Sequence, residues 1–132
     1  MPHRPESVGV WLRHAHGDLA LARARLGPQV ANELLCFHAQ QAAEKTIKAV
    51  LIACGIEPPR THSITALIDL LPPNIPRPDD LMAARTLTSF AAVTRYPGQA
   101  GPVSEEDYRE AVRLAEAVVA WAEEAIGSER ET

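Results

Sequence analysis

The segment from about residue 30 to residue 54 constrains the fold more than any other part of the sequence. Its apolar side chains lie on most of the circumference of a helix of roughly 25 residues, and Gly55 closes it. A helix that is apolar nearly all round has to be covered by other elements, so the pattern predicts a central helix. One polar strip interrupts it, because five side chains fall within an arc of roughly 120° at about 100° per residue: His38, Gln41, Glu44, Lys45 and Lys48.

Four other segments show helical periodicity, and clusters of proline and glycine separate them. They span about residues 6–26, 63–71, 79–94 and 104–126, and Ser63 and Ser104 are candidate N-caps. No run of residues alternates with a period of two, so strands are not expected. Because short connections make neighbouring helices antiparallel, we predict an all-α fold: an up-and-down antiparallel helical bundle of four long helices plus one short crossover helix after the second.

The 132 residues are expected to form a single domain. Its core should cover about residues 6–126, and residues 127–132 should be a frayed tail. The last helix carries two apolar stripes side by side, so its apolar arc is wider than one contact face needs. The surplus could be buried within the chain or could face a second subunit.

Charge and composition disfavour several classes of function. The formal net charge is -4, so the chain lacks the basic surplus that a generic nucleic-acid coat needs. No apolar run approaches the roughly 20 residues of a membrane span, and the first residues hold no apolar signal-peptide core, so we expect a cytoplasmic location. The 2 cysteines and 5 histidines have no metal-ligand spacing, and no glycine-rich phosphate loop is present, so no metal or cofactor is expected.

The polar strip admits two interpretations. It could be a solvated face with a Glu44–Lys48 pair, or a set of donors that line a groove. Both lysines of the chain, Lys45 and Lys48, lie on this strip. His38 is interpreted as a boundary histidine whose hydrogen bonds are satisfied within the fold.

Two connections also carry candidate residues. The sequence Arg60-Thr61-His62 precedes the start of a helix, where His62 could brace the short helix or help to bind an anion. Arg95 ends the fourth predicted helix, where it could bond the last carbonyls. Alternatively, Arg95 and the neighbouring ring of Tyr96 could recognise a phosphate and a base.

Residues 35–49 resemble the central-helix signature of the HEPN domain (higher eukaryotes and prokaryotes nucleotide-binding), above all in the run Gln40-Gln41-Ala42-Ala43-Glu44-Lys45. Three other features resemble this family in the same order along the chain. They are Trp11-Leu12 with Asp18-Leu19, the turn Pro59-Arg60-Thr61-His62-Ser63, and Arg95-Tyr96-Pro97. The resemblance covers about residues 6–126.

The resemblance implies an all-α bundle that usually dimerises and that is often paired with a small nucleotidyltransferase in toxin–antitoxin-like systems. Some branches of the family are metal-independent ribonucleases, in which an arginine is followed after four to six residues by a histidine. This sequence departs from that pattern, because none of its arginines has a histidine five to seven positions later. The chain therefore resembles the non-catalytic branch, and catalysis is not expected of it.

The leading hypothesis is a non-catalytic module that binds a nucleotide or nucleic acid, or assists a nucleotidyltransferase. The candidate ligand-binding residues are Gln41, Lys45, Lys48, His62, Arg95 and Tyr96. One alternative is a divergent metal-independent ribonuclease toxin. A further alternative is a purely structural interaction domain, in which the polar strip only holds the bundle together.

Overall fold

The computed structural model describes residues 5–25, 27, 29–93 and 102–131. Within these residues, five α-helices and one 3-10 helix follow one another as α1 (Pro5–Arg23), α2 (Asn32–Ala53), α3 (Ile64–Asp69), α4 (Asp79–Ala83), η1 (Ala84–Ala92) and α5 (Glu105–Glu131). These described residues contain no strand. The predicted all-α bundle, with a short helix in the connection after the central helix, is confirmed.

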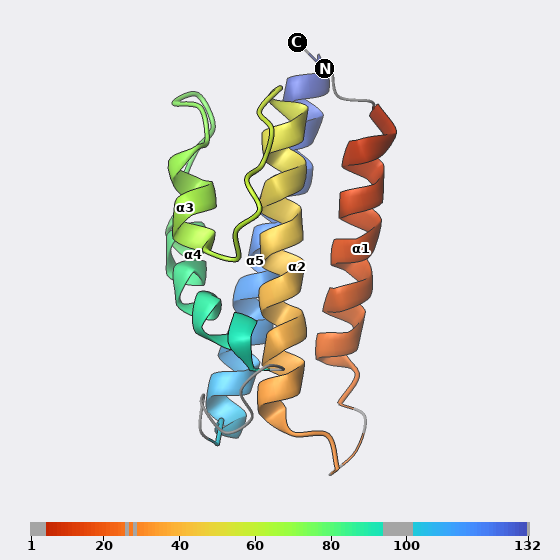
Figure 1. Cartoon of the computed structure of the whole chain (residues 1–132), viewed down its shortest axis with the longest axis vertical. Coiled ribbons are helices and arrows are strands. Elements are labelled where there is room, and N and C mark those ends of the chain that lie inside the picture. The colour runs from red at the N-terminus through yellow and green to blue at the C-terminus, as the bar shows by residue number, and fades with distance from the viewer. Residues whose placement is uncertain (1–4, 26, 28, 94–101, 132) are drawn as a thin grey trace.

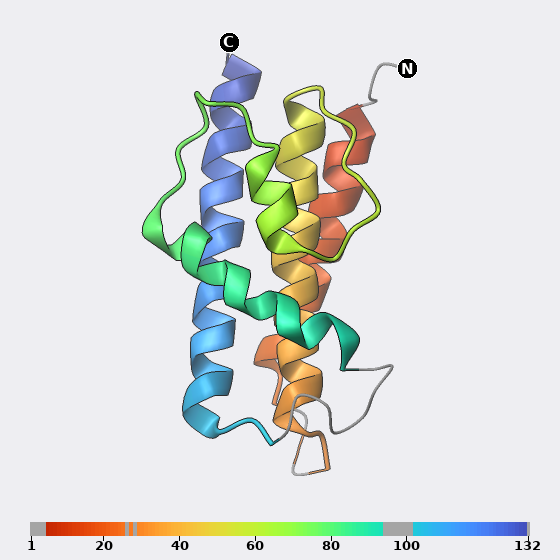
Figure 2. The same ribbon diagram turned by 60° about the vertical axis from the view of Figure 1, so that its left-hand side comes forward.

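The long helices α1, α2 and α5 lie lengthwise beside one another, and α3 and α4 lie on the other side of α2 from α1 (Figure 1). Helix α1 runs antiparallel to both α2 and α5, whereas α2 and α5 run in the same direction. The pairing of His16 with Glu123 and of Arg23 with Glu116 reflects the antiparallel course of α1 and α5. Helices α4 and η1 cross α2 and α5 obliquely, so this fourth part of the bundle is not aligned with the long helices (Figure 2).

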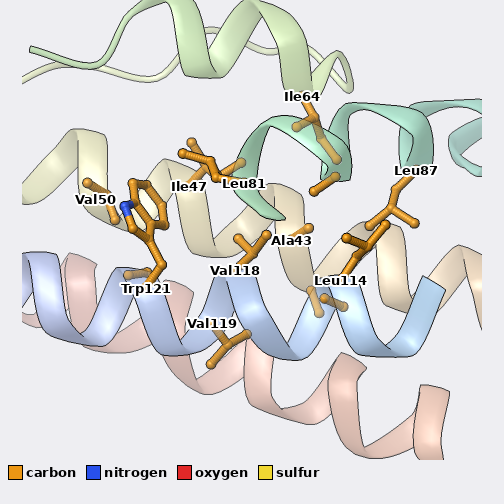
Figure 3. Packing of buried hydrophobic residues seen from close by; sticks show 14 of the residues in the cluster. Ala43, Ile47, Val50, Ile64, Leu81, Leu87, Leu114, Val118, Val119 and Trp121 are labelled. Atoms are coloured by element: carbon orange, nitrogen blue, oxygen red, sulfur yellow. The ribbon is translucent and has the colours of Figure 1, made fainter. Parts of the chain in front are cut away.

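Helix α2 is the centre of the core, as its sequence predicts. Side chains of α2 meet those of α5 on one side and those of α3, α4 and η1 on another (Figure 3). Ile47 and Leu51 of α2 are fully buried, and Val118 of α5 is too. Both apolar stripes of α5 are largely buried within the chain, including Leu114, Val118 and Trp121 on one of them. The surplus apolar arc of α5 is thus used inside the bundle.

The segment predicted as one helix over residues 79–94 changes its type part-way. Its first turn is α-helical, but Ala84–Ala92 form a 3-10 helix. The spacing of the inward side chains explains this change, because Leu81, Ala84, Leu87 and Val93 are buried at intervals of three or six residues. A helix with three residues per turn places such positions on one stripe. The hydroxyls of Thr86 and Ser89 also bond the carbonyls three residues earlier.

Specific polar contacts hold the connections that cover the core. Ser63 is the N-cap of α3, since its Oγ accepts from the backbone N–H of Ala66, and Ser104 Oγ accepts from the N–H of Asp107 before α5. Trp121 Nε1 donates to the Pro76 carbonyl at 2.9 Å, which ties the connection before α4 to α5. Among the helices described, none is long and apolar enough to cross a membrane.

Candidate functional site

Two carboxylates inside the protein pair with the basic side chains in the polar strip of α2. One is Asp18 of α1, and the other is Glu44 of α2 itself. Asp18 lies between His38 and Lys45, which are seven residues apart on α2. His38 Nδ1 lies 3.0 Å from Asp18 Oδ1, and Lys45 Nζ donates to Asp18 Oδ2 at 2.6 Å.

Glu44 accepts hydrogen bonds from three different side chains. Lys48 Nζ donates to Oε2 at 2.9 Å, and His62 Nδ1 lies 2.9 Å from Oε1. Gln40 Nε2 also donates to Oε1, again at 2.9 Å. The carboxyl is nearly inaccessible, since the side chain of Glu44 is 4% exposed and that of Lys48 is 8% exposed.

The ionised state of Glu44 is favoured in spite of its burial. Burial acts to raise the pKa of Glu44, because a buried carboxylate loses its hydration. The hydrogen bonds from the three donors and the charge of Lys48 outweigh burial, so the pKa lies below its ordinary value. Glu44 is therefore a charged acceptor at neutral pH.

Two further contacts extend this arrangement along α2. Gln41 Nε2 donates to Gln40 Oε1 at 2.7 Å, and Gln40 Nε2 approaches the backbone carbonyl of His62 at 3.4 Å. Lys48 Nζ lies 5.6 Å from the centre of the Trp11 ring, within the range of a cation–π contact. We call the hydrogen-bonded set of Gln40, Gln41, Glu44, Lys48 and His62 the Glu44 network.

The structure brings together three of the six candidate residues. Gln41, Lys48 and His62 belong to the Glu44 network, and Lys45 lies on the α1 side of the same strip, bonded to Asp18. Arg95 and Tyr96 lie outside the described residues. The side chain of His62 is 53% exposed although its Nδ1 contacts a buried carboxylate.

The contacts of His62 and His38 in the structure can be compared with the roles that the sequence suggested for these residues. His62 links the connection before α3 to α2 through Glu44, which is the bracing contact that one interpretation supposed. His38 is partly buried and bonded to Asp18, as expected of a boundary histidine. Among the described residues, no group of three or more potential metal ligands occurs.

Two members of this arrangement were named from the sequence only as parts of the family signature and were not among the candidate ligand-binding residues. Gln40 is fully buried and connects Gln41 with both Glu44 and the His62 carbonyl. Its position one residue before Gln41 places it about 100° from that residue and outside the strip, where it counts as a core position. Asp18 is the only acid between residues 7 and 32, which was the available signal that α1 holds a partner for the α2 cations.

The protein is thus an all-α bundle around a central helix, and the two lysines of that helix are paired with carboxylates inside the protein. A sequence model of the HEPN domain matches residues 8–125, so the chain belongs to the HEPN domain family. A comparison with curated proteins gave no match.

Two solved structures are similar over nearly the whole chain. TT1696 from Thermus thermophilus is 31% identical, with a TM-score of 0.75, and the match covers 89% of this chain and 97% of that one. ST0689, described as an archaeal HEPN homologue, is 33% identical, with a TM-score of 0.71 and coverage of 90% and 97%.

Proposed function

We propose that this protein is a non-catalytic HEPN module that binds a nucleotide or nucleic acid. In this proposal it acts in the cytoplasm as a homodimer and as the accessory partner of a small nucleotidyltransferase, in a toxin–antitoxin-like pair. Membership of the HEPN family supports a role connected with nucleotides or RNA.

The observation that carries the non-catalytic part is the absence of an arginine–histidine pair at the spacing of the ribonuclease branch. Metal-independent cleavage of RNA needs a group that takes the proton of a ribose 2′-hydroxyl near neutral pH, and histidine is the usual one. No histidine follows Arg95 in this sequence. Tyr96 would be a poor substitute, because an unperturbed phenol titrates near pH 10.

The proposed ligand-binding residues are Gln41, Lys45, Lys48, His62, Arg95 and Tyr96. Of the four that the structure describes, His62 has the most exposed side chain among those in ion pairs, and the two lysines are largely enclosed. A ligand phosphate at Lys45 or Lys48 would have to compete with Asp18 or Glu44. This competition favours a second candidate function, a purely structural interaction domain, in which the same ion pairs only join the helices.

Titration of the purified protein with AMP and with a short single-stranded RNA separates these functions. The binding module predicts saturable binding that Arg95→Ala or His62→Ala weakens by about fivefold or more, the loss of one hydrogen bond. Arg109→Ala is a matched control, because the Arg109 side chain is 76% exposed on α5 and outside the proposed site. Equal affinity in all variants would refute the site, and absence of all binding would leave the structural role. Cleavage of the RNA would indicate the ribonuclease alternative.

A further inference from the structure

The hydrogen bond between His62 and Glu44 fixes which ring nitrogen carries the proton. An ionised carboxylate can only accept hydrogen bonds, so the Nδ1 atom that lies 2.9 Å from Glu44 Oε1 must be the N–H of the imidazole. The lowered pKa of Glu44, held down by its donors against burial, supports the ionised state. Neutral His62 therefore has its lone pair at Nε2, where it is a hydrogen-bond acceptor.

The other members of the Glu44 network also use their donors internally. Lys48 Nζ donates to Glu44 Oε2, and the side-chain amide of Gln41 donates from Nε2 to Gln40 Oε1. The remaining polar atom of Gln41 is the carbonyl oxygen Oε1, a second acceptor. Within the described part of the chain, neither His62 Nε2 nor Gln41 Oε1 has a hydrogen-bond partner. The network thus directs these N–H donors to oxygen atoms of its own side chains and leaves two acceptors without a partner among the described residues.

Acceptors match a ligand that brings hydrogen-bond donors. Phosphate oxygens at neutral pH are acceptors and would face the lone pairs of His62 and Gln41 unfavourably. The hydroxyls of a ribose and the exocyclic amino group of a nucleobase are donors and are complementary to them. Lys48 is paired with Glu44, so the network holds no lysine cation without a partner that could reverse this preference.

We propose that His62 Nε2 and Gln41 Oε1 recognise the donors of a nucleoside, either ribose hydroxyls or a base amino group, and that this network does not hold the phosphate. Glu44 is the positioning residue, since it fixes the tautomer of His62 without touching the ligand. This inference rests on the proposed function and assigns the part of the ligand that this network contacts. It differs from the anion-binding alternative for the Arg60-Thr61-His62 turn.

The tautomer can be tested without any substitution. Long-range 1H–15N spectra of the imidazole rings, recorded at about pH 8, report which nitrogen is protonated. His16 is an internal control, because its side chain is also 53% exposed but its Nε2 contacts Glu123. We expect the Nδ1–H tautomer for His62 and the Nε2–H tautomer for His16. An Nε2–H tautomer for His62 would overturn the inference.

The ligand preference is tested at the same pH with adenosine, purine riboside, 2′,3′-dideoxyadenosine and inorganic phosphate. We expect adenosine to bind and phosphate not to displace it. Weaker binding of purine riboside would assign the amino group as the donor, and weaker binding of the dideoxy compound would assign the hydroxyls; either result supports the proposal.

His62→Phe should weaken adenosine binding by about fivefold or more, whereas His16→Phe should leave it unchanged. Displacement of adenosine by phosphate, or unchanged affinity in His62→Phe, would overturn the inference while leaving the proposed function intact. If AMP and RNA bind and adenosine does not, the inference alone fails. If none of the three binds, the proposed function fails together with it.

Discussion

Replacement of Glu44 by alanine removes the acceptor on which three side chains converge. Lys48, only 8% exposed, would then lose its charge partner, and Gln40 would lose its best acceptor. Breaking a buried ion pair by removing one partner costs about 3–5 kcal/mol, and the slight access of Lys48 to solvent favours the lower end. We expect Glu44→Ala to lower the free energy of unfolding by about 3 kcal/mol.

Urea unfolding followed by circular dichroism measures this loss. With an m-value of about 1.5–2 kcal/mol per molar urea, the midpoint should fall by about 1.5–2 M. The double variant Glu44→Met with Lys48→Met should recover most of the loss, because an apolar pair leaves no buried charge without a partner. Glu124→Ala, at an exposed position of α5, is the control and should change the stability by less than about 0.5 kcal/mol.

The same variant also tests the sign of the pH dependence. The folded-state pKa of Glu44 lies below its ordinary value, so the ionised form stabilises the fold above the ordinary carboxyl pKa of about 4.3. This contribution is lost as the pH falls through the lower, folded-state pKa. The stability gap between wild type and Glu44→Ala should therefore be full at pH 7 and should shrink below about pH 4. A gap below about 1 kcal/mol at pH 7, or one independent of pH, would contradict a stabilising, ionised Glu44 paired with Lys48.

Three further predictions concern residues outside the Glu44 network. Arg77 donates to the carbonyls of four residues that surround the end of α3, Ile68, Leu71, Pro72 and Ile75. Arg77→Met should therefore cost about 2–3 kcal/mol in a thermal melt, and an unchanged Tm would contradict this role. Leu87 is 1% exposed, so Leu87→Ala should cost about 2–5 kcal/mol, whereas exposed Leu70→Ala should cost much less; equal losses would argue against the packing of η1. Burial, aided by Asp107 and Glu33, raises the pKa of Cys36 to about 11, so a thiol reagent at pH 8 should label Cys36 only after unfolding, and rapid labelling of the native protein would count against its burial.

Most of the fold could be predicted from the sequence because its strongest signals are local. The all-round apolar pattern of α2 predicts a central helix, and the serine caps and Gly55 define helix ends within a few residues. The prediction that the last helix ends at residue 126 was wrong, because α5 continues through Gly127 to Glu131. The change from α4 to η1 could not be predicted in this way. Leu81, Ala84 and Leu87 can face inward with a period of either 3.6 or 3.0 residues, and packing against α2 and α5 decides between them.

The candidate site could be predicted only in part, because its chemistry depends on contacts between distant segments. The sequence placed Glu44, Lys45 and Lys48 on one strip. It did not show that Asp18, 27 residues before Lys45, would pair with that lysine, since the relative rotation of α1 and α2 is a property of the packed core. The tautomer of His62 could not be predicted from the sequence either, because it follows from one interatomic contact with Glu44.

We propose that this HEPN domain binds nucleotides or nucleic acid without cleaving them. One measurement tests both halves most directly: incubation of the purified protein with labelled single-stranded RNA in the presence of EDTA, read as bound fraction and as fragment length. We expect a retained, full-length RNA whose retention falls when AMP competes. Shortened RNA would contradict the non-catalytic assignment, and RNA that neither binds nor is cleaved, together with no affinity for AMP, would contradict the binding role.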